Sequence, residues 1–400
     1  ASDVYKRQVL IHPRDTETPP EYDFSIEDLK CSSVNLTPDR NHRAPHTALW
    51  MLTNKCATKC KYCYADRNTS YRPLSTQRVL EIIDEFASLR MGFVDIIGGE
   101  IFLRKDWDLI LAKLVDNNMS PTYISTKLPV SESLIDRLNK TGFNKTVQIS
   151  LDSLDDSTLR KTIGTTPGYV DSIKKGISLL EKYGYPIQID TILTSENSTI
   201  DEIKALYQYI KGIRNLTMWE IRVPEYSLYT PDTFSEIKAT RDQLRSIQDF
   251  VKNSIQPDAK IQIVFSAEAL DAKFRNAGPK KDCFHGGSCG ILQNRLFILP
   301  DGKVSVCEQM YWHKDFIIGD LKTSSLQDIW NSERALQLFN VSKSLFREDS
   351  PCMKCSHFDD CNAKKRRCVV KVIKAYGADN WDYPDPRCKF APKFNNDLIY

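Results

Sequence analysis

The chain has 400 residues, of which 41% are hydrophobic and 27% charged, and its formal net charge is +3 at pH 7. This is typical of a globular protein larger than one ordinary domain, and no run approaches the roughly 18–20 apolar residues of a membrane helix. The polar first residues, Ala1 to Gln8, lack the apolar region of a signal peptide, and the one basic run, Lys364 to Arg367, has no interleaved aromatic residues. We therefore expect a cytoplasmic protein without a membrane or nucleic-acid partner, and we interpret the basic run as a solvated face.

From about residue 47 to residue 223, short β-rich apolar runs alternate with amphipathic helical patterns. The six predicted strands span residues 48–52, 94–97, 122–125, 146–151, 187–193 and 217–223. The predicted helices between them include residues 76–89, 107–115, 169–183 and 200–210. This alternation predicts parallel β–α units, which form either a full or partial barrel or an open doubly wound sheet. In each case ligands gather at the carboxyl ends of the strands.

The pattern changes in the C-terminal third. A further helix is predicted over residues 234–255, and residues 261–265 form either a strand or part of a linker. Two short strands, 295–299 and 303–306, and two helices, 328–339 and 369–376, are predicted among cysteine-rich loops. The predicted organisation is an N-terminal arm (1–45), an α/β domain (46–256), a linker (257–282) and a cysteine-rich domain (283–400).

Twelve cysteines are the unusual feature of the composition. Three lie between Cys56 and Cys63, eight lie between Cys283 and Cys388, and Cys31 stands alone. In a large chain without a secretion signal, closely spaced cysteines indicate metal binding or catalysis rather than disulfides. The sequence therefore predicts two metal regions that flank a cysteine-free middle, with Cys31 as an ordinary thiol.

Cys56, Cys60 and Cys63 follow directly on the first predicted strand. A four-iron cubane normally takes four cysteine ligands, so three thiolates would leave one iron with open coordination sites. A zinc site with a distant fourth ligand, or a packed turn, remains the alternative at this spacing.

The C-x3-C-x2-C spacing, with the aromatic Tyr62 just before the last cysteine, resembles the signature of the radical S-adenosylmethionine (SAM) superfamily. The resemblance implies a partial (β/α)6 barrel similar to a TIM barrel, with Tyr62 on the cofactor side. It also implies a [4Fe-4S] cluster whose open iron is chelated by the amino and carboxylate groups of SAM. One electron, from a donor such as ferredoxin or flavodoxin, then cleaves the sulfonium and yields a 5′-deoxyadenosyl radical that abstracts hydrogen from unactivated C–H bonds.

Gly98, Gly99 and Glu100 end the second predicted strand and resemble the GGE motif of that superfamily, which receives the methionine ammonium. Glycines at such a place let the backbone approach a ligand closely. Residues 190–193 and 219–222 lie where the fifth and sixth strands would pass the adenine.

Further cofactor contacts are implied at later strand ends. Ser125 and Lys127 end the third strand, and Ser150 and Asp152 end the fourth, where they resemble the positions that contact the ribose and the methionine. Arg160 resembles the arginine that pairs with the cofactor carboxylate, since a guanidinium suits bidentate binding. A surface salt bridge is the alternative role of Arg160.

Eight cysteines form the second region, enough for two sets of four. They are Cys283, Cys289, Cys307, Cys352, Cys355, Cys361, Cys368 and Cys388. Their spacing alone is equally compatible with zinc and with iron–sulfur clusters. Together with the upstream signature, the arrangement resembles the SPASM domain, which holds two auxiliary [4Fe-4S] clusters and brings the implied total to three.

The ligand pattern of the SPASM domain implies two sets of cysteines in this chain. One set comprises Cys283, Cys289, Cys307 and Cys368, and the other comprises Cys352, Cys355, Cys361 and Cys388. The six-residue gap between Cys361 and Cys368 is longer than the three-residue spacing of the family, so the exchange between sets is open at that point. Gly286, Gly287 and Gly290 are expected to offer amide hydrogen bonds to sulfur.

Glu308 directly follows Cys307, and an acid at that place acts as a base in sulfatase-maturing relatives. Asp152, Glu220 and Glu225 are other acids at strand ends, and His285 is expected to be structural.

Four functions remain open at this stage. The leading hypothesis is maturation of a ribosomally made peptide by a thioether or carbon–carbon crosslink. Relatives of this kind often carry an N-terminal leader-binding domain of about eighty residues. The stretch before residue 48 is too short for it, and because the chain starts at Ala1 and not at Met, we expect the N-terminal arm to be truncated and leave open whether such a domain preceded it. The alternatives are formylglycine formation in a sulfatase, radical chemistry on a small molecule, and a zinc-binding protein that is not an enzyme. The sequence leaves the substrate and the oligomeric state open.

Overall fold

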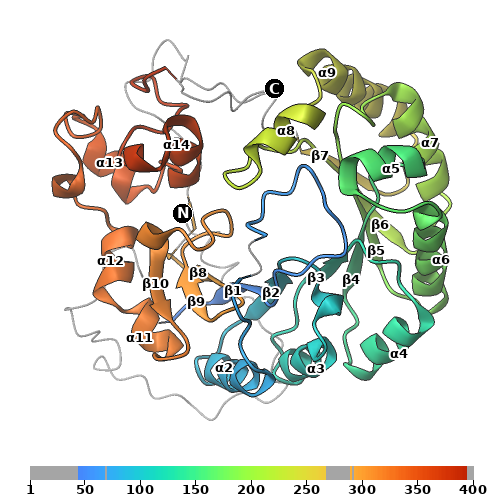
Figure 1. Ribbon diagram of the computed structural model, residues 1–400, viewed down its shortest axis with the longest axis horizontal. Coiled ribbons are helices and arrows are strands. Elements are labelled where there is room, and N and C mark those ends of the chain that lie inside the picture. The colour runs from blue at the N-terminus through green and yellow to red at the C-terminus, as the bar shows by residue number, and fades with distance from the viewer. Residues whose placement is uncertain (1–43, 68–69, 267–288, 291, 394–400) are drawn as a thin grey trace, which may run out of the picture.

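The computed structural model describes residues 44–67, 70–266, 289–290 and 292–393 (Figure 1). Residues 1–43 of the predicted N-terminal arm, with Cys31, lie outside the described residues, as do Cys283, His285, Gly286 and Gly287.

Two five-stranded sheets form the centre of the molecule. The first is parallel throughout, in the order β3-β4-β5-β6-β7. Its strands are β3 (Tyr123–Thr126), β4 (Thr146–Ser150), β5 (Ile187–Ile192), β6 (Leu216–Arg222) and β7 (Gln262–Ser266). The second has the order β10-β9-β8-β1-β2. Its strands are β1 (Thr47–Met51), β2 (Phe93–Ile97), β8 (Arg295–Ile298), β9 (Lys303–Ser305) and β10 (Ile317–Asp320).

Six helices connect the parallel strands and cover their outer side (Figure 1). They are α2 (Thr76–Ser88), α3 (Trp107–Asp116), α4 (Glu132–Lys140), α5 (Asp156–Ile163), α6 (Tyr169–Lys182) and α7 (Ile200–Ile210). In α2, for example, Val79, Ile82 and Phe86 form an apolar stripe that packs in the core, and these side chains are at most 1% exposed. The apolar residues of α5, Leu159 and Ile163, pack instead against Cys60 and Tyr62 of the first cysteine loop. The strands inside this layer of helices form two separate sheets and do not close into a full barrel, which confirms the partial barrel implied by the family resemblance.

The six predicted strands of the α/β region are confirmed to within two residues at each end, the usual uncertainty of element boundaries. Two predicted helices are wrong in extent. The helix expected over 234–255 is divided into α8 (Pro231–Ile237) and α9 (Arg241–Phe250), followed by a short π-helical segment (Val251–Ile255). The chain leaves helical geometry at Lys238, and Thr240 and Gln243 then form a capping box that starts α9.

The helix expected over 328–339 is likewise divided, into α11 (Leu326–Trp330) and α12 (Glu333–Phe339). Ser332 has an extended backbone, and its hydroxyl accepts a hydrogen bond from the Ala335 amide, so it caps α12. Beyond it lie α13 (Phe358–Ala363) and α14 (Val369–Tyr376), the latter as predicted.

The C-terminal region is built onto the barrel. β7 falls inside the stretch predicted as a linker and pairs with β6, so the first sheet continues to Ser266. β8 pairs in parallel with β1, with Thr47 opposite Arg295, and β9 and β10 extend that sheet by antiparallel pairs. The cysteine-rich region therefore begins as an extension of the barrel sheet. Within the described part of the chain, no helix has the length and hydrophobicity needed to cross a bilayer.

Candidate active site

The loop that carries the first three cysteines follows β1 and is held by backbone hydrogen bonds. The Lys59 amide donates to the Ile163 carbonyl at 2.8 Å and the Lys61 amide to the Thr162 carbonyl at 2.9 Å, which ties the loop to the end of α5. The Thr58 hydroxyl lies 3.5 Å from the Cys56 sulfur and 3.3 Å from the Cys60 sulfur. Cys56 is exposed, Cys60 is buried and Cys63 is half-buried.

The two glycines at the end of β2 pack directly against the start of this loop. The Gly99 amide donates to the Thr53 carbonyl at 2.9 Å, and the Glu100 amide donates to the Lys55 carbonyl at 2.7 Å. A Cβ at Gly99 would lie 2.0 Å from the Lys55 carbonyl oxygen, and Gly98 has a φ of +128°. Only glycine fits this contact, so the two residues position the cysteine loop as well as a strand end.

Glu100 is buried and its carboxylate is fully engaged. It accepts hydrogen bonds from the Thr126 hydroxyl at 2.8 Å and from the Lys127 amide at 3.1 Å. Burial raises the pKa of Glu100, and the hydrogen bonds lower it. Burial has the larger effect, so the pKa rises to about 7. The carboxylate therefore ties β2 to the end of β3.

Tyr62, Lys127 and Asp152 form one buried group between the cysteine loop, β3 and β4. The Tyr62 hydroxyl donates to Asp152, and the Lys127 ammonium lies 3.3 Å from the same carboxylate oxygen. The other oxygen of Asp152 accepts from the Ile192 amide at 2.9 Å. Burial opposes the charge of Lys127, yet its pKa is raised because Asp152 lies beside it. Each of these predicted cofactor-binding side chains is thus already bonded to protein.

The other predicted cofactor contacts lie around this group. Ser125 and Ser150 occupy neighbouring strands of the parallel sheet, Ser125 exposed and Ser150 buried. Arg160 lies on α5 with its side chain exposed. Their contact with a cofactor stays a prediction.

Charged side chains lie on the inner face of β5 and β6. Ile189 and Ile221 pack in the core, so the alternating residues Asp190, Glu220 and Arg222 lie on the opposite face. The Arg222 guanidinium lies 2.8 Å from Asp190 and 2.7 Å from Glu220. Burial raises the pKa of Asp190 to about 6, and Arg222 works against that rise.

Glu308 lies beside the first cysteine loop although it belongs to the C-terminal region. The Tyr229 hydroxyl donates to the Met310 carbonyl and the Thr230 hydroxyl to the Cys63 carbonyl, both at 2.7 Å, so residues 229 and 230 bridge the two loops. Burial raises the pKa of Glu308, while Arg295 lowers it, and Glu308 in turn raises the pKa of Tyr64.

The two other acids considered as bases are engaged elsewhere. Glu225 pairs with Lys374 at 3.2 Å across the junction with α14. Glu220 accepts from Arg222 and from the Ser266 hydroxyl, the latter at 3.0 Å.

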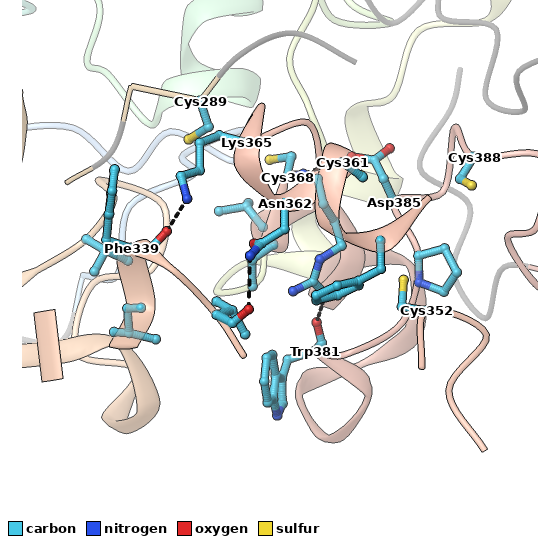
Figure 2. Close-up of a pocket in the computed structure, with 18 of the residues that line it drawn as sticks. Cys289, Phe339, Cys352, Cys361, Asn362, Lys365, Cys368, Trp381, Asp385 and Cys388 are labelled. Atoms are coloured by element: carbon cyan, nitrogen blue, oxygen red, sulfur yellow. Dashed lines mark hydrogen bonds between the residues drawn. The ribbon is translucent and has the colours of Figure 1, made fainter. Parts of the chain in front are cut away.

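A cavity of about 170 Å³ in the C-terminal region is lined by all seven of its cysteines that the structure describes (Figure 2). They are Cys289, Cys307, Cys352, Cys355, Cys361, Cys368 and Cys388. Phe339, Phe358 and Trp381 also line it. The ten cysteines in the described part of the chain are all free thiols.

The thiols of this cavity fall into two groups by their mutual influence. Cys289 and Cys368 both raise the pKa of Cys307, beyond the larger effect of burial. Cys355, Cys361 and Cys388 likewise raise the pKa of Cys352, which burial brings to about 12. Figure 2 places Cys289 and Cys388 on opposite sides of the cavity. Largely buried thiols that line one cavity resist ionisation until a cation binds them, which is compatible with a bound metal cluster.

No sequence motif marks several residues that hold this site together. Buried Asn197 donates to the carbonyls of Asp152 and Ile192, at 2.7 and 2.9 Å, and the Tyr169 hydroxyl donates to the Lys127 carbonyl at 2.6 Å. The basic run was also misinterpreted, because Arg366 is only 7% exposed and Arg367 lines the cavity. These roles depend on long-range contacts that no local motif marks.

Comparison with known proteins agrees with this geometry. The radical SAM superfamily model matches residues 50–210, and the SPASM model, an iron–sulfur cluster-binding domain, matches residues 289–356. The PqqA peptide cyclase of Granulibacter bethesdensis is 22% identical over 350 residues, which cover 87% of this chain and 88% of that protein. The mycofactocin maturase MftC of Mycolicibacterium smegmatis is 24% identical, over 88% and 84% of the two chains.

Among solved structures, Streptococcus suis SuiB bound to its precursor peptide SuiA has the same fold. Its TM-score is 0.63 at 17% identity, over 86% of this chain and 75% of SuiB. The two family models, the relatives and the shared fold lead to one conclusion. The chain belongs to the radical SAM superfamily, in the subgroup that carries a SPASM domain.

Proposed function

We propose that this chain is a radical SAM enzyme that modifies a ribosomally made peptide by forming a thioether or carbon–carbon crosslink. The observation that carries the proposal is the meeting of a three-thiol loop, a polar barrel interior and a seven-thiol cavity in one chain. The relatives support the substrate class, since their names describe a peptide cyclase, a maturase and a protein bound to its precursor peptide.

Cys56, Cys60 and Cys63 would hold one [4Fe-4S] cluster together with SAM, which when bound supplies hydrogen abstraction from a carbon of the substrate. The protein positions this loop by the close contact of Gly99 with Lys55 and by the backbone bonds to α5. The further proposed contacts of SAM are Gly98, Glu100, Ser125, Ser150 and Arg160.

The Tyr62, Lys127 and Asp152 group would fix the wall of the cofactor pocket. Because the Asp152 carboxylate already accepts from Tyr62, Lys127 and the Ile192 amide, it holds three segments in register. Side chains locked in this way lose little freedom when a ligand binds.

In the C-terminal cavity, the grouping of Cys289 and Cys368 with Cys307 supports the proposed first auxiliary set, with Cys283 as its fourth ligand. The second set would comprise Cys352, Cys355, Cys361 and Cys388. With the N-terminal cluster, the chain would carry three [4Fe-4S] clusters and receive electrons from a donor of the ferredoxin or flavodoxin type.

Glu308 would be the base that removes a proton from the substrate once hydrogen has been abstracted. Burial raises the pKa of Glu308, which increases its affinity for a proton and so favours a role as general base. The inner face of β5 and β6 offers the substrate ion-paired side chains, and nearby Gln148 is buried with no hydrogen-bond partner for its amide nitrogen among the described residues.

The test is co-expression with short candidate precursor peptides, followed by mass spectrometry of the peptide. Anaerobically reconstituted protein should bind about twelve irons per chain and form 5′-deoxyadenosine, and the peptide should lose two hydrogens per crosslink. A Cys56→Ala, Cys60→Ala, Cys63→Ala triple variant is the matched control.

Formylglycine in a sulfatase-derived peptide, with no crosslink in any precursor peptide, would replace the proposal by the sulfatase-maturing function. Bound zinc and a colourless protein would overturn the enzyme assignment.

A further inference from the structure

Arg367 lies in the wall of the C-terminal cavity, immediately before Cys368. One terminal nitrogen of its guanidinium donates to the Trp381 carbonyl at 2.5 Å and to the Tyr383 carbonyl at 3.1 Å. The guanidinium carbon lies over the Phe346 ring, 4.8 Å from its centre, and 5.8 Å from that of Trp381. Two carbonyls and two aromatic rings therefore fix the position of this cation.

The carboxylates nearest to this cation already have partners. Asp382 pairs with Arg347 at 2.7 Å, and Asp385 pairs with Arg387 at 2.8 Å. Across the described ranges, no carboxylate lies within ion-pair distance of Arg367. A half-buried cation without an ion-pair partner is unfavourable, so a negative charge bound nearby would stabilise Arg367.

The second group of cysteines lies where that charge is needed. Cys352 and Cys361 are close enough to Arg367 for the charge of its guanidinium to act on both sulfur atoms. Both cysteines line the same cavity as Arg367. A four-iron cluster with four thiolate ligands is an anion, and its charge and surroundings set its reduction potential.

We infer that Arg367 is a positioning residue whose charge compensates the cluster held by Cys352, Cys355, Cys361 and Cys388 and raises its reduction potential. The inference rests on the proposed function, because it takes these four cysteines to be cluster ligands. A nearby cation stabilises the reduced cluster, which carries one more negative charge, over the oxidised cluster. The effect should be confined to this cluster, because Arg367 is not among the main influences on Cys307 and Cys368.

The experiment compares the holoenzyme with Arg367→Met and Arg367→Lys by redox titration of the three clusters, followed by EPR spectroscopy. Arg367→Met should weaken one-electron reduction of one cluster at least tenfold, a downward shift of about 59 mV or more. Arg367→Lys keeps the charge and should shift that potential less. Lys364→Met is the control, since it removes a cation whose side chain is 57% exposed and should leave all three potentials in place.

The outcomes are separable from failure of the proposed function, because wild-type protein without a C-terminal cluster would refute that function before any variant is made. If Arg367→Met loses one cluster and binds about eight irons while Arg367→Lys keeps about twelve, a charge requirement is supported. Loss of the cluster in both variants would overturn the inference in favour of packing. Full loading of Arg367→Met with unchanged potentials, or an equal shift of all three, would also overturn it.

Discussion

The N-terminal cysteine loop and the C-terminal cysteine cavity both present cysteine thiols, but they differ in exposure and in how the thiols are brought together. The loop is short and backbone-anchored, with Cys56 exposed at its start. The cavity gathers its thiols from segments that span a hundred residues, and aromatic rings such as Phe346, Phe358 and Trp381 pack edge to face around it.

This difference matches the two tasks. A cluster that must admit a small molecule needs an open side and a loop held from behind, which the contacts of Gly99 and α5 provide. A cluster that only exchanges electrons is better enclosed, because burial and nearby charges then control its potential. The predictions below test this division, beginning with the largest effect.

Replacing one thiol in each region should separate the two tasks. Cys60→Ala should lower 5′-deoxyadenosine formation more than about 100-fold, because the cluster loses one of three ligands. Cys361→Ala should retain cleavage of SAM and lose the crosslinked product. Liquid chromatography of 5′-deoxyadenosine and mass spectrometry of the peptide measure the two steps. If Cys60→Ala still cleaved SAM, the assignment of SAM cleavage to the first cysteine loop would be wrong.

Removing the proposed base should affect only the second step. Glu308→Gln should leave cleavage of SAM largely intact and lower product formation about 100-fold, the usual contribution of a general base. Because the pKa of Glu308 is raised, product formation by the wild type should increase with pH as the carboxylate ionises. Glu308→Gln should remove that dependence, and an unchanged product yield would exclude Glu308 as the base.

Gly99→Ala should damage the loop without touching the cavity. The added Cβ would lie 2.0 Å from the Lys55 carbonyl oxygen, so the loop must move and the free energy of unfolding should fall by roughly 1–3 kcal/mol. Iron analysis should give about eight irons per chain instead of about twelve. Gly212→Ala is the control, since its nearest atom would be at 3.4 Å. Full iron content in Gly99→Ala would contradict this role.

The last prediction concerns the buried carboxyl of Glu100 in cluster-free protein, which affects stability and not the reaction. Its folded-state pKa of about 7 exceeds the ordinary 4.5, so the folded state holds a proton that the unfolded state has released between these values. Stability should therefore fall by up to about 3 kcal/mol as the pH rises from 4.5 to 7.

Urea denaturation at several pH values measures this slope. Glu100→Gln should flatten it, while Glu132→Gln, at an exposed position of α4, should keep it. An unchanged slope in Glu100→Gln would show that another group titrates.

Most of the secondary structure of the α/β region could be predicted from local sequence patterns. The strand and helix periodicities placed β1 to β6, because residues in such elements face the core at fixed intervals. Two predicted helices were wrong in extent, because the Thr240 capping box and the Ser332 cap each start a new helix inside a continuous helical pattern. The membership of β7 in the sheet depends on pairing with β6, which its own sequence does not encode.

By itself, the sequence determined the chemistry and the elements that carry it: the three-thiol spacing after a strand, the eight later cysteines and the succession of strands and helices along the chain. Only the tertiary structure decided that β8 joins β1, that Glu308 lies beside the first cysteine loop, and that Arg367 faces the cavity instead of solvent. The physical reason is distance along the chain. Spacing within a loop is fixed by covalent geometry, whereas contacts between remote segments depend on how the whole core packs.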